Sequence, residues 1–248
     1  MTDWHPPRTV DHREATLSFA VRLTDAFTGN RPEDVTVAID PVDVDPVLNP
    51  SGYHVFLDLD ADAVTLTVDG GDDYVDERRR VLFDPEAADA DPGSDTAVAG
   101  DDDGSEAVPT HVVEDPSTPL EIELTPTPAY AFPSSTTTVR GHVEDADGDP
   151  VAGATVTLRE FDPVVETTDS GEFALWAPVT AEHVVRRDGR NVVVVDSIDG
   201  NGTSGTALAD GDGTDPTLVV EHPDFGETTE PVEVAAGART VHYVTLHG

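Results

Sequence analysis

The segment Val139-Arg-Gly-His-Val-Glu-Asp-Ala-Asp-Gly-Asp-Pro-Val-Ala-Gly-Ala-Thr-Val-Thr-Leu158 carries the clearest structural signal in the chain. Small or apolar residues occupy every second position from Val139 to Val143, which is typical of a half-buried β-strand. Asp147-Gly-Asp-Pro150 favours a turn, because Gly accepts positive φ and Pro cannot donate to a sheet. Alternation resumes from Thr155 to Leu158. The segment therefore predicts two strands joined by an acidic turn.

The next segment, Thr168-Asp-Ser-Gly-Glu-Phe-Ala-Leu175, adds a tight Ser-Gly turn and a third strand. Together, these residues resemble the carboxypeptidase-regulatory-like module through V-x-G-x-V and D-x-x-G-x-P-V-x-G-A-x-V. The resemblance covers about half of the chain and implies a small transthyretin- or immunoglobulin-like β-sandwich. It concerns the non-catalytic accessory domain of the carboxypeptidases, so it implies no peptidase activity.

The same pattern recurs earlier in the chain. Val21 and Pro32 have the same spacing as Val139 and Pro150, and Ser51-Gly52 corresponds to Ser170-Gly171 with one residue of offset. Such self-similarity indicates a repeated structural unit. The predicted fold is all-β, with two tandem immunoglobulin/transthyretin-like β-sandwiches. The predicted boundaries are an N-terminal arm at 1–15, a first sandwich at 16–125, a Pro-rich linker at 126–135 and a carboxypeptidase-regulatory-like sandwich at 136–248.

Two segments interrupt the strand pattern. Residues 84–119 are acidic and almost without large apolar side chains, so we expect a long insertion that is mostly disordered in isolation. Residues 125–133 contain three prolines in nine positions, which favours a stiff, extended spacer. Tyr130 and Phe132 lie in this spacer, and we expect them to pack as structural wedges; exposed docking aromatics are the alternative.

The charge balance is extreme. The chain has 51 acidic residues against 13 basic ones, all of them Arg, and a formal net charge of −38 over 248 residues. Such self-repulsion indicates a protein of a halophilic archaeon, because molar salt shortens the Debye length to roughly 3 Å. The charge argues against nucleic-acid binding, which needs a basic surface.

Sequence features also bear on the cellular location. The chain has no Cys, which excludes disulfides and thiolate metal sites. Its first residues lack the apolar core of a signal peptide, and no apolar run is long enough for a membrane helix. We expect cytoplasmic synthesis without a signal peptide, no membrane insertion, and incorporation into a particle that can leave the cell.

The sequence predicts no enzyme, no cofactor and no catalytic residue. His111-Val-Val-Glu114 is the nearest match to a zinc-peptidase pair, but such pairs arise by chance in a chain this acidic. No G-x-S-x-G elbow or Gly-rich phosphate loop is present. Asp145–Asp149 and Asp210–Asp215 offer several oxygens each, so bound Ca²⁺ stays open as an alternative to simple acidic turns.

Arg78, Arg79 and Arg80 form the only run of three consecutive basic residues. One interpretation is local pairing with neighbouring carboxylates. The other is docking to an acidic partner surface, because the guanidinium fork suits carboxylates. The neighbouring acids are Asp73, Asp76 and Glu77.

Two function hypotheses remain. The first is a non-enzymatic structural or adaptor subunit that docks on a larger protein assembly through Arg78–Arg80. The segments Phe19–Gly29 and Asn49–Phe56 resemble accessory proteins of phage-tail-like contractile injection systems, which implies a virion-like particle as the assembly. The second is a ligand-binding accessory module, for glycans or peptides, that works beside a separate enzyme.

Overall fold

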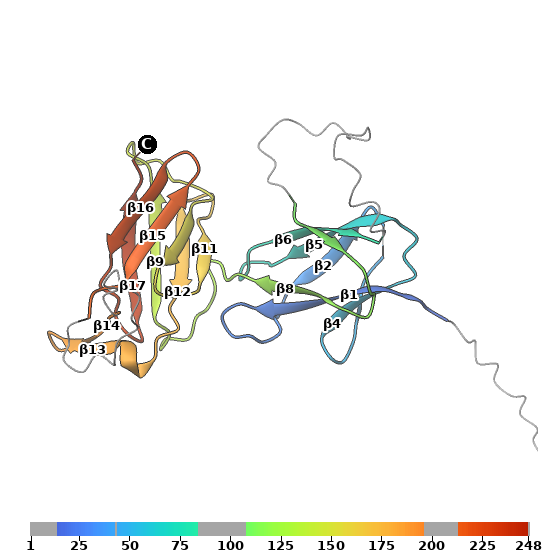
Figure 1. Cartoon of the computed structure of the whole chain (residues 1–248), viewed down its shortest axis with the longest axis horizontal. Helices are drawn as coiled ribbons and strands as arrows, with labels where there is room; N and C mark the ends of the chain where they lie inside the picture. Colours follow the sequence, from blue (N-terminus) through green and yellow to red (C-terminus); the bar gives the residue numbers. More distant parts are fainter. Residues whose placement is uncertain (1–13, 43, 84–107, 196–212, 248) are drawn as a thin grey trace, which may run out of the picture. The chain divides into compact units, whose positions relative to one another are not determined.

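The computed structural model describes residues 14–42, 44–83, 108–195 and 213–247. The described chain consists of strands, turns and one short 3₁₀ helix, so the predicted all-β class is confirmed (Figure 1). None of its helices is long and apolar enough to cross a membrane. The chain divides into two compact units. Unit 1 comprises Met1–Gly71 and Val75–Leu124, and unit 2 comprises Asp72–Tyr74 and Thr125–Gly248.

Unit 1 contains two four-stranded sheets, ordered β3-β4-β1-β8 and β2-β5-β6-β7. Its strands are β1 (Leu17–Asp25), β2 (Thr36–Asp40), β3 (Val47–Leu48), β4 (Tyr53–Leu57), β5 (Ala63–Asp69), β6 (Glu77–Leu82), β7 (Thr110–Val112) and β8 (Leu120–Leu124). Alternate residues of β1, β2 and β5 are buried, as expected for sheets with one face in a core. The ring of Phe19 stacks on Phe56 with centroids 4.6 Å apart. This pattern is consistent with a β-sandwich.

Unit 2 contains a three-stranded sheet, β12-β9-β17, a four-stranded sheet, β11-β10-β15-β16, and the β13-β14 hairpin. Its strands are β9 (Thr138–Glu144), β10 (Thr155–Leu158), β11 (Val164–Glu166), β12 (Glu172–Trp176), β13 (Val184–Arg187), β14 (Arg190–Val193), β15 (Thr217–His222), β16 (Gly226–Pro231) and β17 (Arg239–Thr245). The 3₁₀ helix η2 (Ala181–His183) precedes β13. Val139 and Val143 of β9 are fully buried.

Strands β1 and β9 occupy equivalent positions in their sheets. In unit 1, β1 pairs antiparallel with β4 and parallel with β8, the last strand of that unit. In unit 2, β9 pairs antiparallel with β12 and parallel with β17, again the last strand. This equivalence accounts for the repeated sequence pattern, because the same neighbours impose the same alternation of buried and exposed residues.

The structure corrects two expectations. Residues 84–119 are not all loop, because Thr110–Val112 form β7 and pair parallel with β6. Val113, which follows, is 9% exposed, so one short apolar run in this segment does reach the core. Residues 84–107 lie outside the described part of the chain.

Residues 126–135 are also not a bare spacer. The segment turns at Thr127–Tyr130, where the Tyr130 N–H donates to the Thr127 carbonyl. Its aromatic side chains pack within unit 2: the ring centroids of Phe132 and Trp176 are 6.1 Å apart. Burial of aromatic surface outweighs the preference of proline-rich chain for solvated extension. This packing fits the expectation that Tyr130 and Phe132 are structural residues that pack against a sandwich, rather than exposed docking aromatics.

Candidate functional site

The first candidate surface lies on the solvent-facing side of the sheet β2-β5-β6-β7 and is here called the arginine face. It consists of the exposed Arg78 and Arg80 of β6 and their cross-strand neighbours. Arg78 lies beside Thr67, and Arg80 lies beside Thr65 and Thr110. The neighbours are small, so the two guanidinium groups are the largest side chains in the centre of this face.

Arg79 belongs to the opposite side of the strand. It is the cross-strand neighbour of Leu66, which is fully buried, so its side chain points to the inner face of the sheet. Its Nη2 lies 2.8 Å from Oε2 of Glu77, and both side chains are mostly covered. The three consecutive arginines therefore do not act as one cluster, because successive residues of a strand point to opposite faces.

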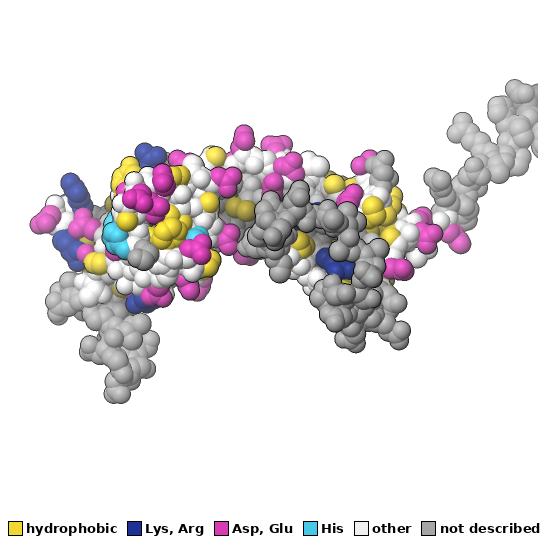
Figure 2. Space-filling view, turned by 90° about the horizontal axis from the view of Figure 1, so that it is seen from above, with side chains coloured by type: hydrophobic (Ala, Val, Ile, Leu, Met, Phe, Trp, Pro, Cys, Tyr) yellow, Lys and Arg dark blue, Asp and Glu magenta, His cyan; other side chains and the backbone are white. Residues whose placement is uncertain are grey.

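The structure shows no carboxylate partner for Arg78 or Arg80 among the residues it describes. Two carboxylates share the face. Asp40 is separated from Arg80 by two strand spacings, about 10 Å. Asp69 lies diagonally across from Arg78, and its Oδ1 accepts the Gly71 N–H at 2.9 Å. Carboxylates are abundant elsewhere, and Figure 2 shows Asp and Glu side chains spread over the face it presents. Four other described arginines are also exposed without a carboxylate partner in the described ranges, namely Arg31, Arg186, Arg190 and Arg239. Arg78 and Arg80 differ from them because both stand on the same face of one strand.

The candidate metal sites bring together few ligands. His111 lies on β7 and Glu114 follows that strand. No group of three His, Asp or Glu side chains that could hold a metal ion occurs in the described ranges. In the acidic turn, Oδ1 of Asp145 accepts the N–H groups of Asp147 and Asp149, each at 2.9 Å, so this carboxylate stabilises the turn itself. In the other candidate calcium turn, Asp210–Asp215, residues 210–212 lie outside the described part of the chain, and Oδ1 of Asp215 accepts from Nη1 of Arg187 at 2.6 Å.

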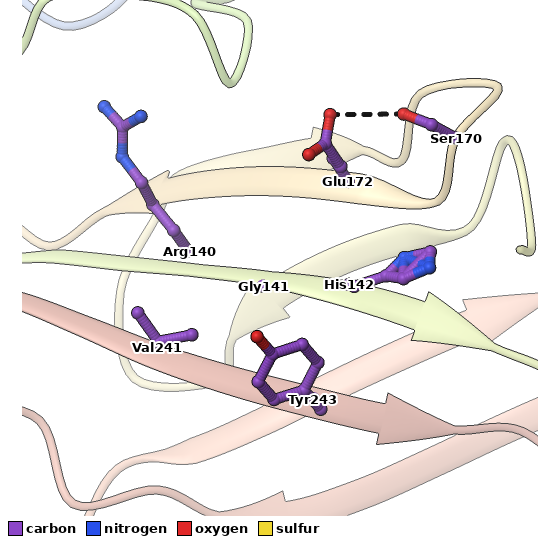
Figure 3. A pocket seen from close by; sticks show the side chains of 7 residues that line it. All are labelled: Arg140, Gly141, His142, Ser170, Glu172, Val241 and Tyr243. Carbon is purple, nitrogen blue, oxygen red and sulfur yellow. Dashed lines mark hydrogen bonds between the residues drawn. The ribbon is translucent and has the colours of Figure 1, made fainter.

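The second candidate surface is a groove of about 450 Å³ on the solvent-facing side of the sheet β12-β9-β17, here called the sheet groove (Figure 3). Strand β9 supplies its floor and β12 and β17 its flanks. Glu172, His142 and Tyr243 are direct neighbours across the three strands. The groove is lined by Arg140, Gly141, His142, Ser170, Glu172, Val241 and Tyr243.

The guanidinium group of Arg140 is held at one end of the sheet groove. Nη1 donates to the carbonyl of Pro128 at 2.6 Å, and Nη2 donates to the carbonyl of Tyr130 at 3.0 Å. The group also lies 5.3 Å from the ring centroid of Phe132, within the range of a cation–π contact. Burial lowers the pKa of Arg140, and the charge of Arg239 adds to this effect. Arg140 is thus a fixed wall of the groove.

His142 and Glu172 supply different hydrogen-bonding groups. Nδ1 of His142 is buried and has no hydrogen-bond partner. The other ring nitrogen of His142, Nε2, is accessible to solvent and has no hydrogen-bond partner among the described residues. Oε2 of Glu172 accepts a hydrogen bond from Ser170 at 3.2 Å, as Figure 3 shows, and Oγ of Ser170 also lies 3.0 Å from Oγ1 of Thr168.

Sequence reasoning does not identify the sheet groove. The alternating pattern of β9 places Arg140 and His142 on the polar face of their strand, and this is the one feature of the sequence that points toward the groove. Glu172 belongs to the strand expected after the Ser-Gly turn, and the sequence marks neither Glu172 nor Tyr243 as part of a site. Their proximity depends on pairing between strands some 30 and 100 residues away from β9, which no local pattern reveals.

No family model matches the chain, and no curated protein matches it. Among solved structures, one similar chain is "The Bacillus anthracis TIE protein", with 10% sequence identity and a TM-score of 0.26. The alignment covers 97% of this chain but spans only 42% of the length of the other. A TM-score this low carries no argument about function. The carboxypeptidase-regulatory-like, halophilic and injection-system resemblances therefore stay predictions from the sequence.

Proposed function

We propose that the protein is a non-enzymatic adaptor that docks on a larger protein assembly, such as a phage-tail-like particle, through the arginine face of unit 1. The single observation that carries this proposal is that two exposed arginines without a carboxylate partner among the described residues, Arg78 and Arg80, stand together on one face of β6. Arg79 is excluded from the docking set, because it faces inward and pairs with Glu77.

The composition of the face suits a protein surface rich in carboxylates. Each guanidinium can form a forked pair with one carboxylate, and the small Thr neighbours let a partner backbone approach. An exposed ion pair contributes only about 0.2–1 kcal/mol, but truncating one member of a pair desolvated at an interface costs about 2–5 kcal/mol. Docking through this face is therefore sensitive to both arginines.

Site-specific photo-crosslinking tests the proposal. A photoreactive residue at Thr67, which is exposed beside Arg78, should crosslink the chain to one protein of defined mass in native lysate at molar salt. The same residue at Thr229, exposed on β16 of unit 2, is the control position. The Thr67 product should disappear in the variant Arg78→Ser/Arg80→Ser.

A matched variant controls for loss of charge. Arg22→Ser/Arg159→Ser also removes two arginines whose side chains are about half exposed. This control should keep the Thr67 crosslink. A crosslink that persists without Arg78 and Arg80, or that forms equally from Thr229, would contradict docking through the arginine face.

A further inference from the structure

We propose that the sheet groove of unit 2 binds a neutral carbohydrate. This site lies on a different sheet and a different unit from the arginine face, so it adds a second binding function to the proposed adaptor role. It does not depend on whether docking through the arginine face is correct.

The position of the groove requires recognition by side chains. Its floor is β9, which is hydrogen-bonded on one side to β12 and on the other to β17. The backbone of β9 is therefore already paired, and an extended peptide cannot add to it as a strand. A ligand in the groove must instead contact side chains that stand on the sheet face.

One side of the ligand would lie on an apolar surface. Tyr243 is 72% exposed and Val241 is 54% exposed, and both stand on the same face of β17. Val241 lies beside Arg140, and Tyr243 lies beside His142. An exposed Tyr ring offers a flat apolar surface with a polar end, which fits the C–H face of a sugar ring and its hydroxyl rim.

Groups that bond hydroxyls face this apolar surface. A buried Nδ1 without a partner favours the tautomer that carries its proton on Nε2, because a buried N–H without an acceptor costs more than an unused lone pair. Nε2–H of His142 can then donate to a ligand. The ionised carboxylate of Glu172 can only accept hydrogen bonds, and the hydrogen bond that it accepts from Ser170 orients it. A donor beside an acceptor matches neighbouring hydroxyls, each of which both donates and accepts.

The dimensions suit one or two sugar units. Glu172, His142 and Tyr243 form a row across three strands, and two strand spacings give a length of about 10 Å. The groove volume of about 450 Å³ falls within the usual range of small-molecule sites. The row thus combines an acceptor, a donor and an aromatic ring within the width of a short glycan.

The charges around the groove argue against an ionic ligand. An anion would meet the carboxylate of Glu172, and the guanidinium of Arg140 is already partly used, because Nη1 and Nη2 each donate one N–H to a backbone carbonyl and Nε is buried. A cation would meet the positive charge of Arg140 at one end of the groove. A neutral polyhydroxylated ligand avoids both conflicts and uses every group in the row.

The test is a titration of the ¹⁵N-labelled full chain at molar salt with three neutral hexasaccharides: maltohexaose, cellohexaose and chitohexaose. We expect at least one to shift the amide signals of β9 and β17 with a dissociation constant below about 10 mM. Tyr243→Ala should weaken binding at least about tenfold, and Tyr243→Trp should retain it. Glu172→Gln should also weaken it, because one charged acceptor is lost.

Val164→Ala is the matched control, since Val164 is 51% exposed on β11 in the other sheet of unit 2. It should bind like the parent. The proposal is wrong if none of the three sugars shifts the groove amides, or if Tyr243→Ala binds as tightly as the parent. It is also wrong if phosphate or acetate displaces the sugar, because that result would identify an anion site.

Discussion

At Gly141, strand β9 lies so close to the backbone of β17 and to the ring of Phe173 that there is no space for a side chain. The substitution Gly141→Ala tests how much this close packing contributes to stability. A Cβ at this position would overlap the carbonyl oxygen of His242 on β17 and would lie 2.8 Å from two ring carbons of Phe173. Neither neighbour has room to move. The His242 carbonyl belongs to the paired strand, and Phe173 is 1% exposed in the core.

The cost follows from two effects. Forcing an extra methyl group into a packed core costs about 1–3 kcal/mol. Displacing β17 would also weaken one or two ladder hydrogen bonds of about 1 kcal/mol each. Reduced freedom of the unfolded chain returns about 0.4–1 kcal/mol for Gly→Ala. We therefore expect a net destabilisation of about 3 kcal/mol for Gly141→Ala.

Urea unfolding followed by tryptophan fluorescence measures this change. The chain has two tryptophans, and a Trp4→Phe background leaves only Trp176, which is 8% exposed on β12. The control is Gly148→Ala, at φ +86°, where a Cβ would meet no atom within 4 Å. It should lose only the roughly 1–2 kcal/mol of a left-handed non-glycine residue. A Gly141→Ala variant as stable as this control would refute the reasoning.

Three further predictions concern salt, pH and a buried hydroxyl. The unfolding midpoint should rise from dilute buffer to molar chloride, since the net charge of −38 is screened; a flat or falling midpoint in thermal melts would contradict this. Burial, with the charge of Arg31, lowers the pKa of His54. His54 of the unfolded chain keeps the ordinary pKa of about 6.5, so as the pH falls it is protonated before His54 of the folded chain. Protonation therefore favours the unfolded state, and the protein loses stability below about pH 6.5, by at most about 1.4 kcal/mol per pH unit from this residue. Urea titrations between about pH 7.5 and about pH 5.5 should show a smaller loss for His54→Gln. Oγ1 of Thr167 accepts from the Ala154 N–H at 2.8 Å and donates to the Val151 carbonyl at 2.7 Å. Thr167→Val should cost about 2 kcal/mol or more in urea unfolding, and Thr167→Ser should cost less; equal losses would show that the hydroxyl is not the stabilising group.

Period-two patterns predict the strands that have one buried face. Leu17–Leu23 and Val139–Val143 alternate in sequence, and both segments form strands that are paired on both sides. Burial alternates along β1, whereas in β9 Val139 and Val143 are buried and Gly141 between them is half-buried. The pattern works there because burial on one face determines every second residue. β6 lacks such a signal, since its first four residues are Glu-Arg-Arg-Arg. The sequence therefore presents the three arginines as one cluster, whereas the strand divides them between two faces.

The remaining differences arise from contacts between distant residues. The prolines of 126–135 favour an extended spacer, but the contacts of Arg140 with the carbonyls of Pro128 and Tyr130 come from tertiary packing. The sheet groove likewise needs β9, β12 and β17 in one register. The strand propensity of a short segment does not predict which strands pair or in which register, because the packing of the whole unit determines both.

The central claim is that the chain works as part of a larger protein assembly through Arg78 and Arg80. Sedimentation of the tagged full chain from native lysate in molar salt tests it most directly. The account predicts that the parent and Arg22→Ser/Arg159→Ser sediment far faster than a free chain of 26.2 kDa, and that Arg78→Ser/Arg80→Ser sediments as the free chain while still folded. A parent that sediments as a free monomer, or a double variant that sediments with the parent, would contradict it.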